Sequence, residues 1–285
     1  MKLKPKTMKL NNFVVRTLAG AVYLAIMLAA FLTNEYVFAG VAIIFTAGMV
    51  NEFCLLGKDS VTLPVRILSV TAAVCLFLLV FAYGVWGMPA KYIAALILPL
   101  ICIVLSCIVD PARNQMNGIA RSLAGLLYIA VPMSLSTLLV LRSGSFDGRV
   151  LLAFFIMIWG SDIGAYCIGT LFGQKETSRK LCPSVSPHKS WAGFWGGLCT
   201  AVVAGIVLSN TVLLPVSIWH AAGLAVTIHL AGTLGDLFES RWKRDAGVKD
   251  SGNVIPGHGG LLDRLDSSLL AVPAACAYLI LTNLW

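Results

Sequence analysis

The sequence has 285 residues, of which 58% are hydrophobic and only 12% are charged. Soluble domains carry about a quarter charged residues, so this composition excludes a soluble globular enzyme, a disordered chain and a nucleic-acid-binding domain. The mean hydropathy of +0.87 predicts instead an all-α protein that crosses a membrane several times. In such a protein the net charge of +8 first reports how the helices are oriented.

Nine apolar runs are long enough to span a membrane as helices, which takes about 20 residues each. In chain order they cover 13–33, 36–56, 65–86, 90–109, 119–142, 149–173, 192–210, 216–239 and 263–285. Helices are expected because they satisfy their own backbone hydrogen bonds in lipid. We therefore predict one integral membrane domain, in which 1–142 supplies the N-terminal spans. The remaining spans, 149–285, carry the chemically active residues and two long breaks, 174–191 and 240–262.

Lysine and arginine are distributed unevenly over the two sides of this arrangement. With the N-terminus inside, 18 of the 21 cations fall on the inner side, and only Lys91, Arg142 and Arg149 fall on the outer side. Cytoplasmic loops of membrane proteins carry an excess of Lys and Arg. The N-terminus and both long loops are therefore predicted to face the cytosol, with the protein in the cytoplasmic (inner) membrane.

The segment 236–266 holds six of the 13 acidic residues. Asp236 ends the eighth run and Asp263 begins the ninth, so their side chains can be neighbours on one side of the membrane. Two carboxylates brought together repel unless a proton or a metal lies between them, and oxygen ligands of this kind suit Mg²⁺. Glu239 follows Asp236 by three residues, and Asp266 follows Asp263 by three. Each pair can therefore share one helix face, with Glu239 and Asp266 as additional ligands. A solvated loop between two spans is the alternative.

Cations and a histidine surround these acids. Lys243, Arg244 and Lys249 could supply the fixed positive charges that a triphosphate requires. His258 lies among glycines just before Asp263, where it could orient a carboxylate or donate to a phosphate. A solvated loop histidine is the alternative for this residue.

Two further groups of polar residues come earlier in the chain. Ser186, Lys189 and Ser190 precede the seventh run, where a helix N-terminus would offer an anion site. A plain helix cap with an interfacial lysine is the alternative. Asp162 lies within the sixth run, on the order of 16 Å deep, where a carboxylate is costly unless it faces a polar interior. A protonated packing residue is the alternative there, and for Glu52, near the end of the second run, a place in the site stays open.

Together these motifs resemble the phosphatidate cytidylyltransferase family, the CDP-diacylglycerol synthases. The resemblance is carried by Ser240-Arg241-Trp242-Lys243-Arg244, Lys249-Asp250-Ser251-Gly252, Pro256-Gly257-His258-Gly259-Gly260 and Asp263-Arg264-Leu265-Asp266, with support from Gly235 to Ser240, Ser186 to Ser190 and Asp162 to Tyr166. Trp242, Ile163 and Ala192 depart from the residues that are usual in the family.

The resemblance implies a reaction in which CTP and phosphatidic acid give CDP-diacylglycerol and diphosphate. It also implies dependence on Mg²⁺ bound at Asp236 and Asp263, a second cation as an addition, a homodimer among membrane lipids and no nucleic acid partner. The implied catalytic residues are Asp236, Asp263, Lys249, Asp250 and Lys189. The implied substrate-binding residues are Ser186, Ser190, Lys243, Arg244, His258, Arg264 and Asp162.

Two other functions remain open at this point. A CTP-dependent lipid kinase would also use CTP and a metal, but it would attack the γ-phosphorus and release CDP. A transporter could use Asp162 and Glu52 as an ion route. Transporters commonly have two similar halves, whereas the polar residues here gather in the C-terminal third.

Overall fold

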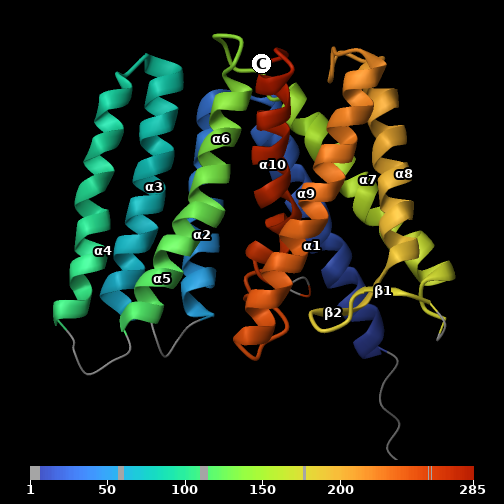
Figure 1. Ribbon diagram of the computed structural model, residues 1–285, viewed down its shortest axis with the longest axis horizontal. Helices are drawn as coiled ribbons and strands as arrows, with labels where there is room; N and C mark the ends of the chain where they lie inside the picture. Colours follow the sequence, from blue (N-terminus) through green and yellow to red (C-terminus); the bar gives the residue numbers. More distant parts are fainter. Residues whose placement is uncertain (1–6, 57–60, 110–114, 176–177, 256, 258) are drawn as a thin grey trace, which may run out of the picture.

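The computed structural model describes residues 7–56, 61–109, 115–175, 178–255, 257 and 259–285, and it is a bundle of helices that run roughly side by side (Figure 1). The elements are α1 (Thr7–Leu32), α2 (Glu35–Leu55), α3 (Leu63–Trp86), the 3-10 helix η1 (Ala90–Leu96), α4 (Ile97–Val109), α5 (Gln115–Gly125), the π-helix η2 (Leu126–Ala130), α6 (Val131–Val140), α7 (Arg149–Phe172), β1 (Lys180–Cys182), β2 (Ser186–Ser190), α8 (Trp191–Ser209), α9 (Ile218–Asp245) and α10 (Leu262–Leu281). The prediction of an all-α membrane protein is confirmed.

Eight helices within the described residues are long and apolar enough to cross a membrane. They include the continuous segment Asn117–Val140, where α5, η2 and α6 follow one another. The predicted fourth run, 90–109, is divided between η1 and α4 and contains only a shorter apolar helix, Ala90–Ser106. In Figure 1 this segment lies beside α3. The count of nine spans therefore stays a prediction.

Two boundaries differ from those predicted. The break 174–191 contains a two-stranded antiparallel hairpin, in which β1 pairs with β2. Helix α9 continues six residues past the predicted end at 239, to Asp245. This extension is polar, but it is stabilised by ion pairs one turn apart, between Glu239 and Lys243 at 2.8 Å and between Arg241 and Asp245 at 3.1 Å. Apolar length alone therefore placed the helix end too early.

Glycines let the last four helices approach closely. A Cβ on Gly193 of α8 would lie 2.8 Å from the carbonyl oxygen of Ala165 in α7, and one on Gly197 would lie 2.9 Å from that of Ser161. A Cβ on Gly235 of α9 would lie 2.6 Å from the carbonyl oxygen of Asp266 in α10. Small residues at such crossings are typical of membrane helices, because they bring backbones and polar side chains together.

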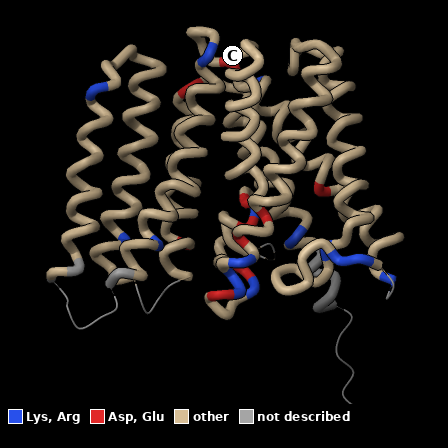
Figure 2. The backbone as a smooth tube through the Cα atoms, viewed as in Figure 1, with Lys and Arg blue, Asp and Glu red and all other residues tan. Residues whose placement is uncertain are grey.

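Most of the Lys, Arg, Asp and Glu residues lie at one end of the bundle, the lower end in Figure 2, and a few lie at the other end. This end also carries the β-hairpin and the connection between α9 and α10 (Figure 1). Lysines and arginines within 1–6, 57–60 and 110–114 are predicted to lie on the inner side, and they fall outside the described residues.

Candidate functional site

A cavity of about 600 Å³, called here the hairpin cavity, lies between α7, α8, α9 and the β-hairpin and has charged and polar side chains in its wall. Asp162 lines it from α7, Ser186, Lys189 and Ser190 from the hairpin, and Asp236 from α9. The Lys189 ammonium group forms an ion pair with the Asp236 carboxylate, and both side chains stay partly exposed, at 28% and 29%. The structure thus brings together five predicted site residues from three separate stretches of the sequence.

The local fold explains the position of Lys189. Ser190 is the N-cap of α8, and its hydroxyl accepts a hydrogen bond of 3.2 Å from Gly193 N. This cap ends β2 and begins the helix, so Lys189 comes directly before a helix N-terminus, as predicted. Beside it, Ser161 Oγ and His229 Nδ1 lie 2.8 Å apart in the cavity wall, a pair that the sequence reading missed.

The second group of charges joins α9 to α10. Lys243 Nζ lies 2.8 Å from Glu239 Oε2 and 2.6 Å from Asp263 Oδ1. All three side chains are at least nine-tenths buried. Lys243, which the resemblance implies as a substrate-binding residue, therefore forms ion pairs with two acids in the structure.

The other oxygen of Asp263 is held by the connection that precedes α10. Its Oδ2 accepts hydrogen bonds from Ser251 N at 2.9 Å, Ser251 Oγ at 3.0 Å and Gly260 N at 2.8 Å. Gly259 has a φ of +86°, and a Cβ there would lie 2.7 Å from Asp263 Oδ2. Glycine is therefore required at 259 both for the backbone conformation and for the close approach.

Glu52, whose place the sequence left open, reaches this connection from α2. It is 3% exposed, and Oε1 accepts from Leu261 N at 3.0 Å. Its Oε2 accepts from Leu262 N at 2.9 Å and from Ser251 Oγ at 3.0 Å. Glu52 thus satisfies free backbone N–H groups at the start of α10, which is how a carboxylate stabilises a helix N-terminus.

Asp266 completes the acidic residues between α9 and α10. It lies near enough to Asp236, Glu239 and Asp162 for their charges to interact. The hydroxyl of Tyr128 donates to the carbonyl oxygen of Gly235 at 3.1 Å and approaches that of Asp266 at 3.4 Å, so η2 is tied to both helices.

A third polar group surrounds a separate pocket of about 500 Å³, called here the loop pocket. Lys249 and Asp250 from the connection, Arg264 from α10 and Arg16 from α1 line it. The sequence predicts Arg16 only as one of the cations on the inner side of the membrane. The signal that could have identified it is its place inside the first apolar run, where a cation needs a polar neighbour.

Arg244 and His258 are the two remaining residues that the sequence predicts for the site. Arg244 donates to backbone carbonyl oxygens, from Nε to Val185 at 3.3 Å and from Nη1 to Val248 at 3.0 Å, so it ties the end of α9 to the hairpin. His258 lies outside the described residues.

The site offers carboxylate oxygens, the type of donor that a divalent cation such as Mg²⁺ prefers. Asp162, Asp236, Glu239, Asp263 and Asp266 supply five carboxylates. Lys189 forms an ion pair with Asp236, and Lys243 forms ion pairs with Glu239 and Asp263. Buried Glu239 Oε1 has no hydrogen-bond partner among the described atoms. The same part of the chain holds no ready-made cluster of three or more His, Cys, Asp or Glu ligands. Mg²⁺ at phosphate sites is commonly bound by one or two carboxylates, with substrate and water completing its shell.

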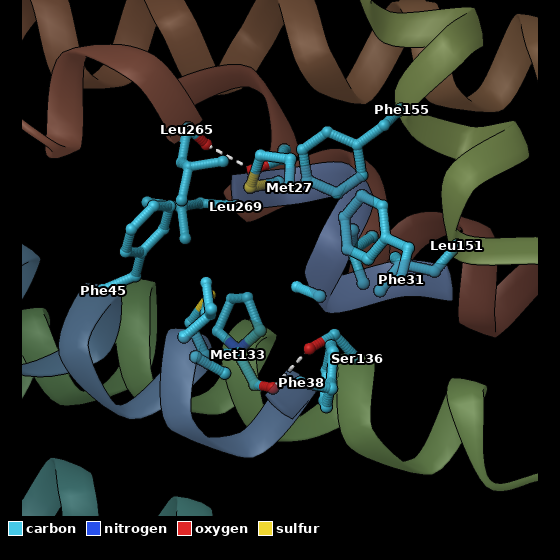
Figure 3. Close-up of a pocket in the computed structure, with 16 residues that line it drawn as sticks. Met27, Phe31, Phe38, Phe45, Met133, Ser136, Leu151, Phe155, Leu265 and Leu269 are labelled. Carbon is cyan, nitrogen blue, oxygen red and sulfur yellow. Dashed lines mark hydrogen bonds between the residues drawn. The ribbon is translucent and has the colours of Figure 1, made fainter. Parts of the chain in front are cut away.

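A further cavity near α10 is apolar and lies among α1, α2, α6 and α7 (Figure 3). Met27, Phe31, Phe45 and Leu269 point toward it in the close-up. Its volume of about 40 Å³ is far below the roughly 300 Å³ at which ligand pockets begin. It is a small void in the core and not a binding site for an acyl chain.

Comparison with known proteins supplies a family for this geometry. The sequence matches the profile of the cytidylyltransferase family over residues 14–282. A phosphatidate cytidylyltransferase of Haemophilus influenzae is 48% identical over 128 residues, which cover 44% of this chain and 43% of the relative. One of Staphylococcus epidermidis is 41% identical over 134 residues, covering 47% of this chain and 50% of the relative. The chain thus spans about half the length of the curated relatives that it matches.

Proposed function

The chain belongs to the cytidylyltransferase family, and from this we propose that it transfers the cytidylyl group of CTP to phosphatidic acid. The products are CDP-diacylglycerol and diphosphate. The observation that carries the proposal is the ion pair between Lys189 and Asp236, which joins two motifs 47 residues apart at the wall of the hairpin cavity.

The chemistry is a displacement at phosphorus. A phosphate oxygen of phosphatidic acid attacks the α-phosphorus of CTP, and the bond from that phosphorus to the bridging oxygen breaks as diphosphate leaves. The attacking oxygen is already anionic, so the enzyme has little need of a strong base. Its main tasks are to hold two anions together and to stabilise the charge on the leaving group. Lys189 is suited to the first task because it is only partly buried at the cavity wall.

We assign the metal to the acids between α9 and α10. Asp236 and Asp263 would hold Mg²⁺, with Glu239 and Asp266 as further oxygen donors, and a second cation would be an addition to this site. When bound, Mg²⁺ supplies positive charge that stabilises phosphate oxygens during displacement. Lys243 positions two of these acids, because its ammonium group contacts both Glu239 and Asp263. Lys249, Asp250 and Arg264 remain candidates for contacts with substrate phosphates.

The apolar helices support a multi-pass membrane protein, and bacterial relatives support the inner membrane. Lys and Arg are in excess at the end of the bundle that carries the β-hairpin and the connection between α9 and α10. This excess supports placing that end in the cytosol, where CTP is present. The family resemblance adds a homodimer to the proposal. Light scattering of the protein in detergent, corrected for bound detergent, should then give twice the chain mass of 30.4 kDa.

One assay tests the activity directly. Purified protein in detergent is supplied with CTP labelled at the α-phosphorus, phosphatidic acid and Mg²⁺, and the products are separated. We expect labelled CDP-lipid and one diphosphate for each lipid converted, and no product when the metal is chelated. Release of CDP with transfer of the γ-phosphate would contradict the proposal and identify a lipid kinase.

The acids are tested by Asp236→Asn and Asp263→Asn, which remove charge with little change of shape. Each variant should lose at least about 100-fold in kcat, because each removes electrostatic stabilisation of a transferring phosphate. Asp245→Asn is the matched control, since Asp245 is exposed at the end of the same helix and, among the described residues, its ion pair is with Arg241. Full activity in either site variant would remove its aspartate from the proposal.

A further inference from the structure

The loop pocket contains more positive charge than its single carboxylate neutralises. Arg16, Lys249 and Arg264 line it together with Asp250, and all four residues are exposed. Within the described part of the chain, no carboxylate lies at ion-pair distance from any of the three cations. Like charges gathered in one pocket repel one another unless an anion lies among them. The pocket is therefore suited to a ligand that carries several negative charges.

The fold places Arg16 in this pocket through a close backbone contact. Gly257 has a φ of +73°, and a Cβ there would lie 2.7 Å from Cγ of Arg16. The arginine stem therefore passes directly over this glycine. About two helical turns further along α1, the hydroxyl of Tyr23 donates to the carbonyl oxygen of Arg264 at 3.4 Å. Helix α1 is thus fixed against both the connection and α10, and the two arginines face one pocket.

The hairpin cavity and the loop pocket differ in the ligand that each would accept. The hairpin cavity has one lysine, which is already paired with Asp236, and it has aromatic lining from Tyr166 and Phe194. Such a cavity suits a lipid with a single phosphate. The loop pocket has three cations without an ion-pair partner among the described residues, and little apolar lining beyond Ile255. Arginine binds phosphate oxygens through two parallel N–H donors, so two arginines and a lysine suit a chain of phosphates.

We propose that Arg16, together with Lys249 and Arg264, forms the binding site for the nucleotide's polyphosphate, and that Arg16 is a substrate-binding residue contributed by the first helix. This inference rests on the proposed function for the identity of the nucleotide. The binding of inorganic diphosphate, however, can be measured without any turnover. The attachment of α1 to the site also makes the N-terminal half of the bundle part of the binding machinery.

The first test is calorimetric titration of the full-length protein in detergent with sodium diphosphate and a chelator. Arg16→Ala and Lys249→Ala should each raise the dissociation constant on the order of tenfold, the effect of losing one charge-assisted contact. Arg16→Lys should raise it less, because it keeps the charge but loses the fork of donors. Arg241→Ala is the control, since this exposed arginine pairs with Asp245 outside both pockets, and its binding should match that of the unaltered protein.

The second test separates nucleotide phosphates from the lipid phosphate. In steady-state kinetics, Arg16→Ala should raise KM for CTP and leave KM for phosphatidic acid in mixed micelles unchanged. Unchanged diphosphate binding by Arg16→Ala and Lys249→Ala, or a rise confined to KM for phosphatidic acid, would overturn the inference. Diphosphate binding that depends on Arg16 without formation of CDP-lipid would refute only the proposed activity. If Arg16→Ala forms CDP-lipid as well as the unaltered protein does, only the assignment of the loop pocket to the nucleotide is refuted.

Discussion

The hydroxyl of Ser251 lies 3.0 Å from two carboxylate oxygens, Glu52 Oε2 and Asp263 Oδ2, but it has one proton to donate. Neither acid depends on that proton alone. Asp263 Oδ2 also accepts from two backbone N–H groups, and Glu52 Oε2 accepts from Leu262 N. Two buried acids from distant parts of the chain therefore share one connection without an unsatisfied oxygen. Asp263 is held in place for its proposed role through contacts that originate on α2.

Replacing Glu52 with glutamine tests this arrangement. The amide would turn an N–H₂ group toward N–H donors at Leu261 or Leu262, whichever way it is oriented. The mismatch should destabilise the protein by about 2 kcal/mol, as for a buried donor left unsatisfied. Thermal unfolding in detergent should show a lower Tm for Glu52→Gln, and Glu35→Gln at the opposite end of α2 is the control. Equal melting temperatures for the two variants would mean that Glu52 does not hold the connection.

At the scale of elements, the crossing of α9 and α10 depends on a single glycine. A Cβ on Gly235 would lie 2.6 Å from the carbonyl oxygen of Asp266, which is rigid backbone. One turn earlier on the same helix, a Cβ on Gly232 would have its nearest neighbours at 3.6 Å, an ordinary contact. The two positions face the same helix and differ in the space available, so they form a matched pair.

Gly235→Ala should therefore force α9 and α10 apart, cost about 1–3 kcal/mol of stability and lower kcat by displacing Asp236 and Asp266. Gly232→Ala should be neutral or slightly stabilising, because alanine favours a helix by about 0.5–1 kcal/mol over glycine. The measurements are Tm in detergent and formation of CDP-lipid. Equal behaviour of the two variants would show that the crossing is not set by close backbone contact.

The helices could be predicted because about 20 consecutive apolar residues are enough to indicate a membrane span. The motifs predicted Asp236, Asp263 and Lys189 as site residues. The sequence did not reveal which of them touch. Lys243 bridges Glu239 and Asp263, and Lys189 pairs with Asp236, through packing of helices that no local pattern encodes. The β-hairpin was missed for the same reason: part of its support comes from Arg244, which donates to Val185 from 59 residues away.

At the scale of the whole molecule, most of the charged residues lie at one end of a largely apolar bundle (Figure 2). The connections 33–34, 87–89, 141–148 and 210–217 lie at the other end (Figure 1). A soluble nucleotide and a lipid can meet only where water and the edge of the bilayer are both within reach. The hairpin cavity and the loop pocket both lie at the charged end, so the orientation of the bundle decides whether CTP can reach them.

The orientation is tested with cysteines placed at the two ends, in a background that lacks the exposed native cysteines. Ser145→Cys lies in the connection 141–148 and Ser184→Cys in the turn of the hairpin, and both positions are exposed. Because the excess of Lys and Arg predicts that the hairpin end is cytosolic, a membrane-impermeant maleimide should label Ser145→Cys in intact cells. Ser184→Cys should be labelled only in inside-out vesicles. The opposite pattern would place both cavities outside the cytosol, away from CTP, and would contradict the proposed reaction even if the purified protein bound diphosphate.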